Sequence, residues 1–148
     1  MITVRPISAD FKLKIAHEGE EVTFTYRQLT YRVKNLIAAA VTSVKQGQVY
    51  VDSALSCFYH IKYAVKHVEG LHNPDGSAYA LAFEDDKKEA LTDACTDELL
   101  ALGFNANLIY ASKQLLNSIP SEIVNPLTGK KLEGVELILD EQALKKNS

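Results

Sequence analysis

Tryptophan is absent from this sequence of 148 residues, and cysteine occurs only twice, at Cys57 and Cys95. This spacing matches no disulfide framework, which excludes a small secreted scaffold stapled by disulfides. No apolar run approaches the roughly 18 residues that a membrane-spanning helix requires. The first residues also lack the cationic segment and apolar stretch of a signal peptide. We therefore expect a cytoplasmic protein with reduced cysteines and no association with membranes.

Motifs for catalysis and cofactor binding are also missing. There is no Gly-x-Gly-x-x-Gly, and residues 128–131 (TGKK) lack the first glycine and the final hydroxyl residue of a phosphate-binding loop. No serine has the Gly-x-Ser-x-Gly context of an exposed nucleophile. The acid pairs Asp85-Asp86 and Asp97-Glu98 are more typical of helix caps and first-turn charges than of a general acid and base. We expect no catalytic residue and no cofactor, hence no enzyme.

The strongest candidate for a metal site is the pair Cys57 and His60 together with His67, His72 and Cys95, because thiolates and imidazoles bind zinc at such spacings. On one continuous helix, however, His60 and His67 would lie one above the other and face away from the apolar stripe. A surface histidine pair is the simpler interpretation. Cys57 at the edge of that stripe is typical of a small packed side chain, so we expect no metal.

Charge and size place the chain among ordinary globular domains. Its net charge is −3, with 47% hydrophobic and 24% charged residues, which excludes a disordered chain. A chain of this length buries about two-thirds of its surface without help from disulfides. The basic residues are scattered among acids, whereas a nucleic-acid-binding domain usually concentrates them on one face. Binding to nucleic acid is therefore not expected.

The N-terminal third predicts a β-hairpin. Residues 11–15 (FKLKI) and 22–26 (VTFTY) alternate apolar and polar side chains, as half-buried strands do. The polar segment 16–21, with one glycine, connects them as a hairpin loop. Residues 2–5 form either a third strand or a lead into the sheet.

Two segments with the helical spacing of apolar residues follow the hairpin. The first covers residues 30–46, where Thr30 is the expected N-cap and Gly47 ends the helix. Its buried face is expected to consist of Val33, Leu36, Ile37, Ala40, Val41 and Val44. The second helix is expected over residues 52–68, and Gly70 ends it. Its apolar stripe consists of Val51, Leu55, Phe58, Ile61, Val65 and Val68.

Two more helices are expected further along the chain. One covers residues 87–102, is capped by Asp85 or Asp86, and has a second start site at Thr92. The other covers residues 105–117. Its apolar side consists of Phe104, Leu108, Ala111 and Leu115.

Turns and short extended segments complete the pattern. Residues 73–76 (NPDG) and 125–129 (NPLTG) are turns, residues 78–83 form a brief strand or an extended segment, and residues 133–139 a strand. The sequence thus predicts an α+β fold in which an N-terminal β-hairpin packs on about four short helices, followed by an irregular or β-like C-terminal segment. We expect one domain over residues 1–120 and a partly flexible C-terminal extension over residues 121–148.

One stretch combines aromatic and basic residues. Tyr26, Arg27, Tyr31 and Arg32 lie close together in sequence, followed by Lys34. Such a mixture serves to stack and neutralise nucleic acid or to form the hot spot of a protein interface. Compared with nucleic-acid binding, the favoured explanation is that Tyr26 completes a strand while Tyr31 and the basic residues open an amphipathic helix, since no second basic cluster extends the stretch.

The same stretch, residues 24–32 (FTYRQLTYR), resembles the strand-to-helix junction of small tail proteins of long-tailed bacteriophages, most closely the tail assembly chaperones. The order downstream is also similar. A helix ends in Val-Glu-Gly at residues 68–70, an Asp-Gly loop follows at 75–76, and Leu-Ala-Phe at 81–83 precedes an acidic helix with Asp-Glu-Leu-Leu at 97–100. The resemblance covers residues 10–118. The departure is the segment 119–139, which is more structured than the loose tail expected in this family.

The resemblance implies a non-enzymatic protein of an infected or lysogenic bacterium. Family members coat the helical tape-measure protein, help to recruit tail-tube subunits, and are absent from the finished particle. It also implies a frameshift-extended form, with which Lys145 and Lys146 are compatible. Tyr26, Arg27, Tyr31 and Arg32 are the predicted interaction residues, and a homo-oligomer stays open. The alternatives are a tail-completion or connector protein retained in the particle, and a small regulatory or nucleic-acid-associated protein.

Overall fold

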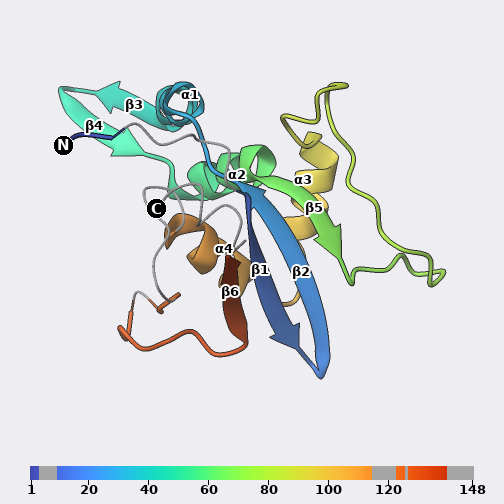
Figure 1. Cartoon of the computed structure of the whole chain (residues 1–148). Helices are drawn as coiled ribbons and strands as arrows, with labels where there is room; N and C mark the ends of the chain where they lie inside the picture. The colour runs from blue at the N-terminus through green and yellow to red at the C-terminus, as the bar shows by residue number, and fades with distance from the viewer. Residues whose placement is uncertain (4–9, 115–122, 126, 140–148) are drawn as a thin grey trace.

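The described part of the chain forms a four-stranded antiparallel sheet, a separate two-stranded hairpin and four helices (Figure 1). The computed structural model describes residues 1–3, 10–114, 123–125 and 127–139. The predicted α+β class and the N-terminal hairpin are confirmed. Within the described residues, no helix has both the length and the apolar character that crossing a bilayer requires.

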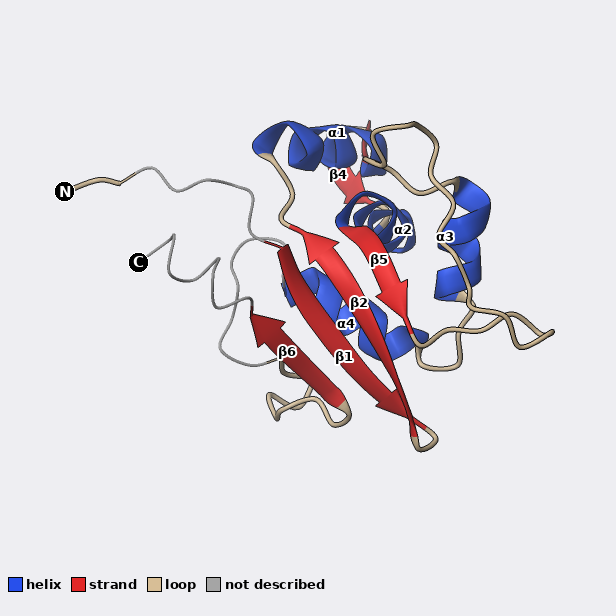
Figure 2. Ribbon diagram, turned by 45° about the vertical axis from the view of Figure 1, so that its right-hand side comes forward, coloured by secondary structure: helices blue, strands red, loops and turns tan. Residues whose placement is uncertain are grey.

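The N-terminal hairpin forms the centre of the larger sheet. Strands β1 (Asp10–His17) and β2 (Glu20–Arg27) pair with Leu13 opposite Phe24. Because side chains alternate along a strand, the apolar residues share one face, which helices cover (Figure 2). The turn between the strands consists of residues 18 and 19 alone, so the predicted loop 16–21 was too long. The buried residues of this face are Phe11, Leu13, Ile15, Val22, Phe24 and Tyr26.

Helix α1 (Tyr31–Val41) begins as predicted but ends early. The Thr30 hydroxyl accepts a hydrogen bond from the backbone N–H of Val33, which confirms the N-cap. Only Ile37 and Val41 are buried, whereas Leu36 and Val44 of the predicted apolar face are exposed. The prediction of a helix to residue 46 was therefore wrong.

A second hairpin replaces the last turns of that expected helix. Strands β3 (Thr42–Lys45) and β4 (Gln48–Val51) pair around Gln46 and Gly47, which both have positive φ angles, 52° and 76°. Positive φ at both central residues is the requirement of the commonest tight hairpin turn. Gly47 thus turns a hairpin and does not end a helix. The β-branched residues flanking it favour the strand conformation.

Helix α2 (Ser53–Ala64) is capped by the Asp52 carboxylate, which accepts from the N–H of Leu55. The predicted helix to residue 68 was too long, because strand β5 (Val65–Glu69) follows directly and pairs with β2 at the edge of the sheet. Val65 and Val68 are buried in the strand conformation that β-branched residues favour.

Two short helices follow a long connection. The turn at residues 73–76 is confirmed by the hydrogen bond from the N–H of Gly76 to the carbonyl of Asn73. Helix α3 (Asp93–Leu100) starts at the second predicted site, with Thr92 as its N-cap. The Asp85 carboxylate instead accepts from the N–H of Glu89 within a loop, so neither it nor Asp86 caps a helix. Helix α4 (Asn105–Gln114) begins at the predicted residue, and Phe104, Leu108 and Ala111 are buried. Its predicted last residues, 115–117, lie outside the described residues.

The C-terminal segment contributes to the same sheet. Strand β6 (Val135–Leu139) pairs with β1 on the side opposite β2, and Val135 is buried. The turn at residues 125–129 is closed by a hydrogen bond from the N–H of Gly129 to the carbonyl of Asn125. The expected roles of residues 4–5, Leu115 and the last nine residues lie outside the described residues.

Gly70 provides the first testable prediction, because it joins β5 to the next loop at a φ of +95°. A Cβ atom there would lie 2.5 Å from the carbonyl oxygen of Glu21. We expect Gly70→Ala to lower the free energy of unfolding by about 2–3 kcal/mol, through backbone strain and this clash together. Gly76→Ala is the matched control. Gly76 has a φ of +89° and nothing within 4 Å of the added Cβ, so about 1 kcal/mol is expected. Equal losses in urea unfolding would rule out the close approach.

Candidate protein-interaction surface

Large exposed hydrophobic side chains gather on helix α1 and the β3–β4 hairpin. Six of the ten among the described residues lie there, with exposed fractions from 49% to 78%. In Figure 1 the hairpin extends from the end of α1 away from the four-stranded sheet. We call these six residues together the α1–hairpin surface. They are Tyr31, Leu36, Val44, Val49, Tyr50 and Val51.

The hairpin has one apolar face that is not covered by the described residues. Every residue of β3 and β4 is exposed. Val44 pairs with Val49 and Thr42 with Val51, which places these four side chains on one face. On the other face, the Tyr50 hydroxyl donates to the Gln48 side chain at 2.8 Å. An isolated two-stranded hairpin is marginal in water, so a partner that covered the valines would stabilise it.

The second half of helix α1, residues 36–41, is apolar on the side that faces solvent as well as on its buried side. Ala38, Ala39 and Ala40 are exposed beside Leu36. A helix that is apolar all round is usually buried. Small side chains also allow another backbone to approach closely. The outer face of α1 therefore has the composition of a packing surface.

A groove of about 400 Å³ borders this helix. Leu29, Val33, Leu36 and Tyr63 supply its apolar lining, and Arg27 is among its polar lining residues. A larger concavity of about 610 Å³ lies between β1 and residues 130–136, but charged side chains dominate its lining. The first groove can take an apolar side chain, and it is lined in part by the exposed Leu36 of the α1–hairpin surface.

The four predicted interaction residues divide between core and surface. Tyr26 is only 1% exposed, and its hydroxyl lies 3.0 Å from the Ser112 hydroxyl. Its predicted place on an interaction surface was wrong, because alternation along β2 turns it into the core. Arg27 is half-buried and donates to the carbonyl of Lys88, while Tyr31 and Arg32 are exposed. Arg27 and Arg32 both line the groove.

The hairpin residues of the surface were missed at the sequence level. Val44 and Val51 were assigned to buried helix faces, and Val49 and Tyr50 to no element. The available signal was the run of β-branched residues on both sides of Gln46 and Gly47, which is typical of a hairpin. The helical spacing of Val44 with Ile37 and Val41 masked it.

The structure separates the candidate metal ligands. His60 lies on α2, where its Nδ1 atom lies 2.6 Å from the carbonyl oxygen of Ser56, whereas His67 lies on β5, 3.3 Å from the Glu69 carboxylate. We expected the two histidines to lie one above the other on a single helix, and this prediction was wrong. Cys95 is buried and lies 3.2 Å from the Tyr79 hydroxyl. Across the described ranges, no group of three or more potential ligands is placed to hold a metal ion.

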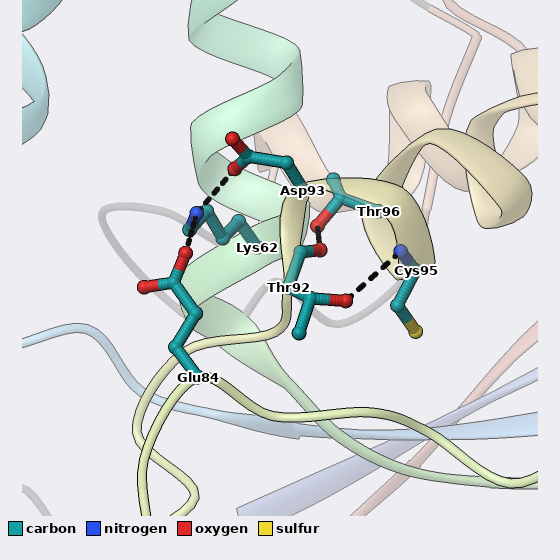
Figure 3. A network of polar contacts seen from close by, with 6 residues as sticks. All are labelled: Lys62, Glu84, Thr92, Asp93, Cys95 and Thr96. Carbon is teal, nitrogen blue, oxygen red and sulfur yellow. Dashed lines mark hydrogen bonds and ion pairs between the residues drawn. The ribbon is translucent and has the colours of Figure 1, made fainter.

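The most buried charged side chain, Lys62 on α2, belongs to a structural network. Its ammonium donates to the carboxylates of Glu84 and Asp93 (Figure 3), and its side chain is only 7% exposed. Beside it Thr92 caps α3, accepting from the N–H of Cys95 at 3.1 Å. Burial lowers the pKa of Lys62, but the hydrogen bonds to Asp93 and Glu84 outweigh it and raise the pKa above 10.5. This permanently charged group fixes the loop before α3 and contacts no groove of the α1–hairpin surface.

Replacing Lys62 tests that structural role. We expect Lys62→Ala to lower the free energy of unfolding by about 2 kcal/mol, less than for a wholly buried pair because both carboxylates retain access to water. Lys66→Ala, at the more exposed pair with Asp10, should cost about 0.5 kcal/mol or less. Because the folded-state pKa of Lys62 is raised, its contribution is complete below pH 10.5 and is lost only as pH rises through the folded value. Equal losses for the two lysines in urea unfolding at neutral pH would contradict this assignment.

Comparison of the chain with protein-family models, curated protein sequences and solved structures finds no match.

Proposed function

We propose that this chain is a non-catalytic tail assembly chaperone of a long-tailed bacteriophage or prophage. It acts in the host cytoplasm, binds the helical tape-measure protein through the α1–hairpin surface, and helps to recruit tail-tube subunits. The observation that carries the binding role is the concentration of exposed hydrophobic side chains on α1 and the hairpin. The assignment to phage tails rests on the resemblance of residues 24–32 to the chaperone junction.

The chemistry of the surface suits such a partner. A tape-measure helix exposes an apolar stripe before the tail tube closes around it, and apolar stripes dock in grooves lined by hydrophobic side chains. The groove beside α1 offers Leu29, Val33 and Leu36 for this contact. The valine face of the hairpin extends the contact beyond the helix.

The expected strength is that of a transient complex. Complete burial of one Val or Leu side chain contributes about 1.5–3 kcal/mol. The six side chains of the α1–hairpin surface are already partly covered, so their further burial contributes on the order of 6–10 kcal/mol. Association costs at least about 4 kcal/mol in lost freedom of motion. A weak net affinity suits a chaperone that leaves before the particle is complete.

Affinity capture from cells that express the whole source locus tests the proposal. We expect the wild-type chain to recover a long helical protein and a tail-tube subunit, identified by mass spectrometry. Purified particles should lack the chain. Its presence there would instead indicate a tail-completion or connector subunit, and recovery of nucleic acid alone would indicate the regulatory alternative.

A further inference from the structure

The segment of the chain that carries the α1–hairpin surface has charges of one sign. Residues 22–51 contain four basic side chains and no aspartate or glutamate. The whole chain has 16 basic and 19 acidic residues. The segment 22–51 therefore has a net charge of +4, whereas the rest of the chain, with 12 basic and 19 acidic residues, has a net charge of −7. This segment is therefore a basic stretch within an acidic chain. The four basic residues are Arg27, Arg32, Lys34 and Lys45.

These cations lack carboxylate partners within the described part of the chain. Lys14, Lys62 and Lys66 each form ion pairs elsewhere, but none of the four does. The Nε atom of Arg27 is buried and has no hydrogen-bond partner there. Because this atom is buried, a partner would meet the charge of Arg27 only through the part of the side chain that lines the groove.

The first turn of α1 adds a second unfavourable arrangement. It contains no acidic residue, although the positive end of the helix dipole favours acids there. Arg32 and Lys34 occupy this turn instead. Only Glu89 contributes a carboxylate to the adjacent groove. An anion carried by a bound partner would relieve the repulsion between these cations and the helix end.

We infer that the segment bound by the α1–hairpin surface is an amphipathic helix whose apolar stripe is flanked by aspartate and glutamate. This inference rests on the proposed use of the surface for protein binding and adds the charge of the partner. The apolar stripe covers Leu36 and the valines, while the flanking carboxylates face Arg27, Arg32 and Lys34. A peptide suits the surface better than nucleic acid, since its exposed side chains are mostly aliphatic, whereas base stacking requires aromatic platforms.

Two synthetic peptides of about 20 residues, long enough to form a helix, test the inference. They share one leucine stripe and carry either glutamate or lysine on both flanks. Fluorescence anisotropy with the full chain at about 0.1 M salt should show binding of the acidic peptide at least about tenfold tighter, which corresponds to about 1.4 kcal/mol. The variant R32E/K34E should remove this preference. The control Lys12→Glu, on an exposed position of β1, should keep it.

Four outcomes would overturn the inference. Equal binding of both peptides, still abolished by L36D/V49D, would refute the acidic flanks and leave the proposed function standing. Single-stranded DNA that displaces the acidic peptide with a steep dependence on salt would favour nucleic acid as the occupant. Self-association that competes with the peptide would make a second copy of this chain the occupant. Absence of binding by either peptide, together with undiminished tape-measure capture by L36D/V49D, would refute the α1–hairpin surface itself.

Discussion

The double variant L36D/V49D is expected to weaken binding to the tape-measure protein by at least about 100-fold, or about 2.7 kcal/mol. Leu36 lies on the outer face of α1 and Val49 on the apolar face of the hairpin, with 51% and 66% of their surfaces exposed. In the complex, both aspartates would be buried among apolar side chains, and an unpaired charge there is strongly disfavoured. Isothermal titration with purified partner measures the loss.

Stability should change far less than binding in this variant. Both positions face solvent in the free protein, so only local helix and strand preferences are affected, by about 1 kcal/mol in total. Leu127→Asp is the matched control, because Leu127 is 83% exposed and lies in a turn outside the α1–hairpin surface. It should bind like the wild type. Unaltered binding by L36D/V49D, or an equal loss in the control, would contradict the assignment of this surface.

The second large effect is expected at Tyr26. Tyr26→Ala should lower the free energy of unfolding by about 3–5 kcal/mol, because the ring is buried and stacks on Phe11 at a centroid distance of 5.9 Å. Tyr26→Phe removes only the hydroxyl that contacts Ser112 and should cost about 1 kcal/mol. Tyr31→Ala, at a 78% exposed position, should change stability by about 0.5 kcal/mol or less.

Urea unfolding of these three variants separates core from surface. A stable Tyr26→Ala protein that had lost only partner binding would return Tyr26 to the interaction surface. The expected order is instead a large loss of stability for Tyr26→Ala and a loss of affinity without loss of stability for Tyr31→Ala. Burial also raises the pKa of the Tyr26 phenol well above its usual value, so its hydroxyl remains neutral wherever the protein is folded near neutral pH.

Local patterns predicted the elements whose residues interact mainly with their chain neighbours. The alternation in β1 and β2 is an example, since a hairpin register follows from side-chain period and turn length. The cap at Thr30 is another, because an N-cap depends on groups only three residues away. These predictions needed no knowledge of the tertiary structure.

Elements that depend on distant pairing were assigned wrongly or with wrong limits. Val65 and Val68 continue the helical spacing of α2, yet they form strand β5 because this segment pairs with the free edge of β2. Val44 fits the helical face of Ile37 and Val41, but the Gln-Gly turn at residues 46 and 47 folds it back onto Val49. In both cases the positions of the apolar residues fit a helix as well as a strand. Turn chemistry and sheet pairing therefore decided which of the two forms.

Only part of the candidate site could be predicted from the sequence, because the hairpin within it depends on pairing between strands. Arg27, Tyr31 and Arg32 were identified from composition, and the structure places the two arginines on one groove. Val44 and Val51 could not be recognised as exposed while they were assigned to buried helix faces, and Val49 was assigned to no element. The acid-free segment 22–51, by contrast, is visible in the sequence alone. It acquires significance only because the fold exposes six of its hydrophobic side chains on α1 and the hairpin.

Amide hydrogen exchange of the full chain, with and without the purified tape-measure protein, tests the central claim most directly. The account predicts slower exchange on binding in α1 and in residues 42–51, where the hairpin alone is marginal. The amides of β1 and β6 should exchange as in the free protein. Protection confined to β1, β6 or residues 130–136, with residues 42–51 unchanged, would contradict the claim that α1 and the hairpin form the binding surface.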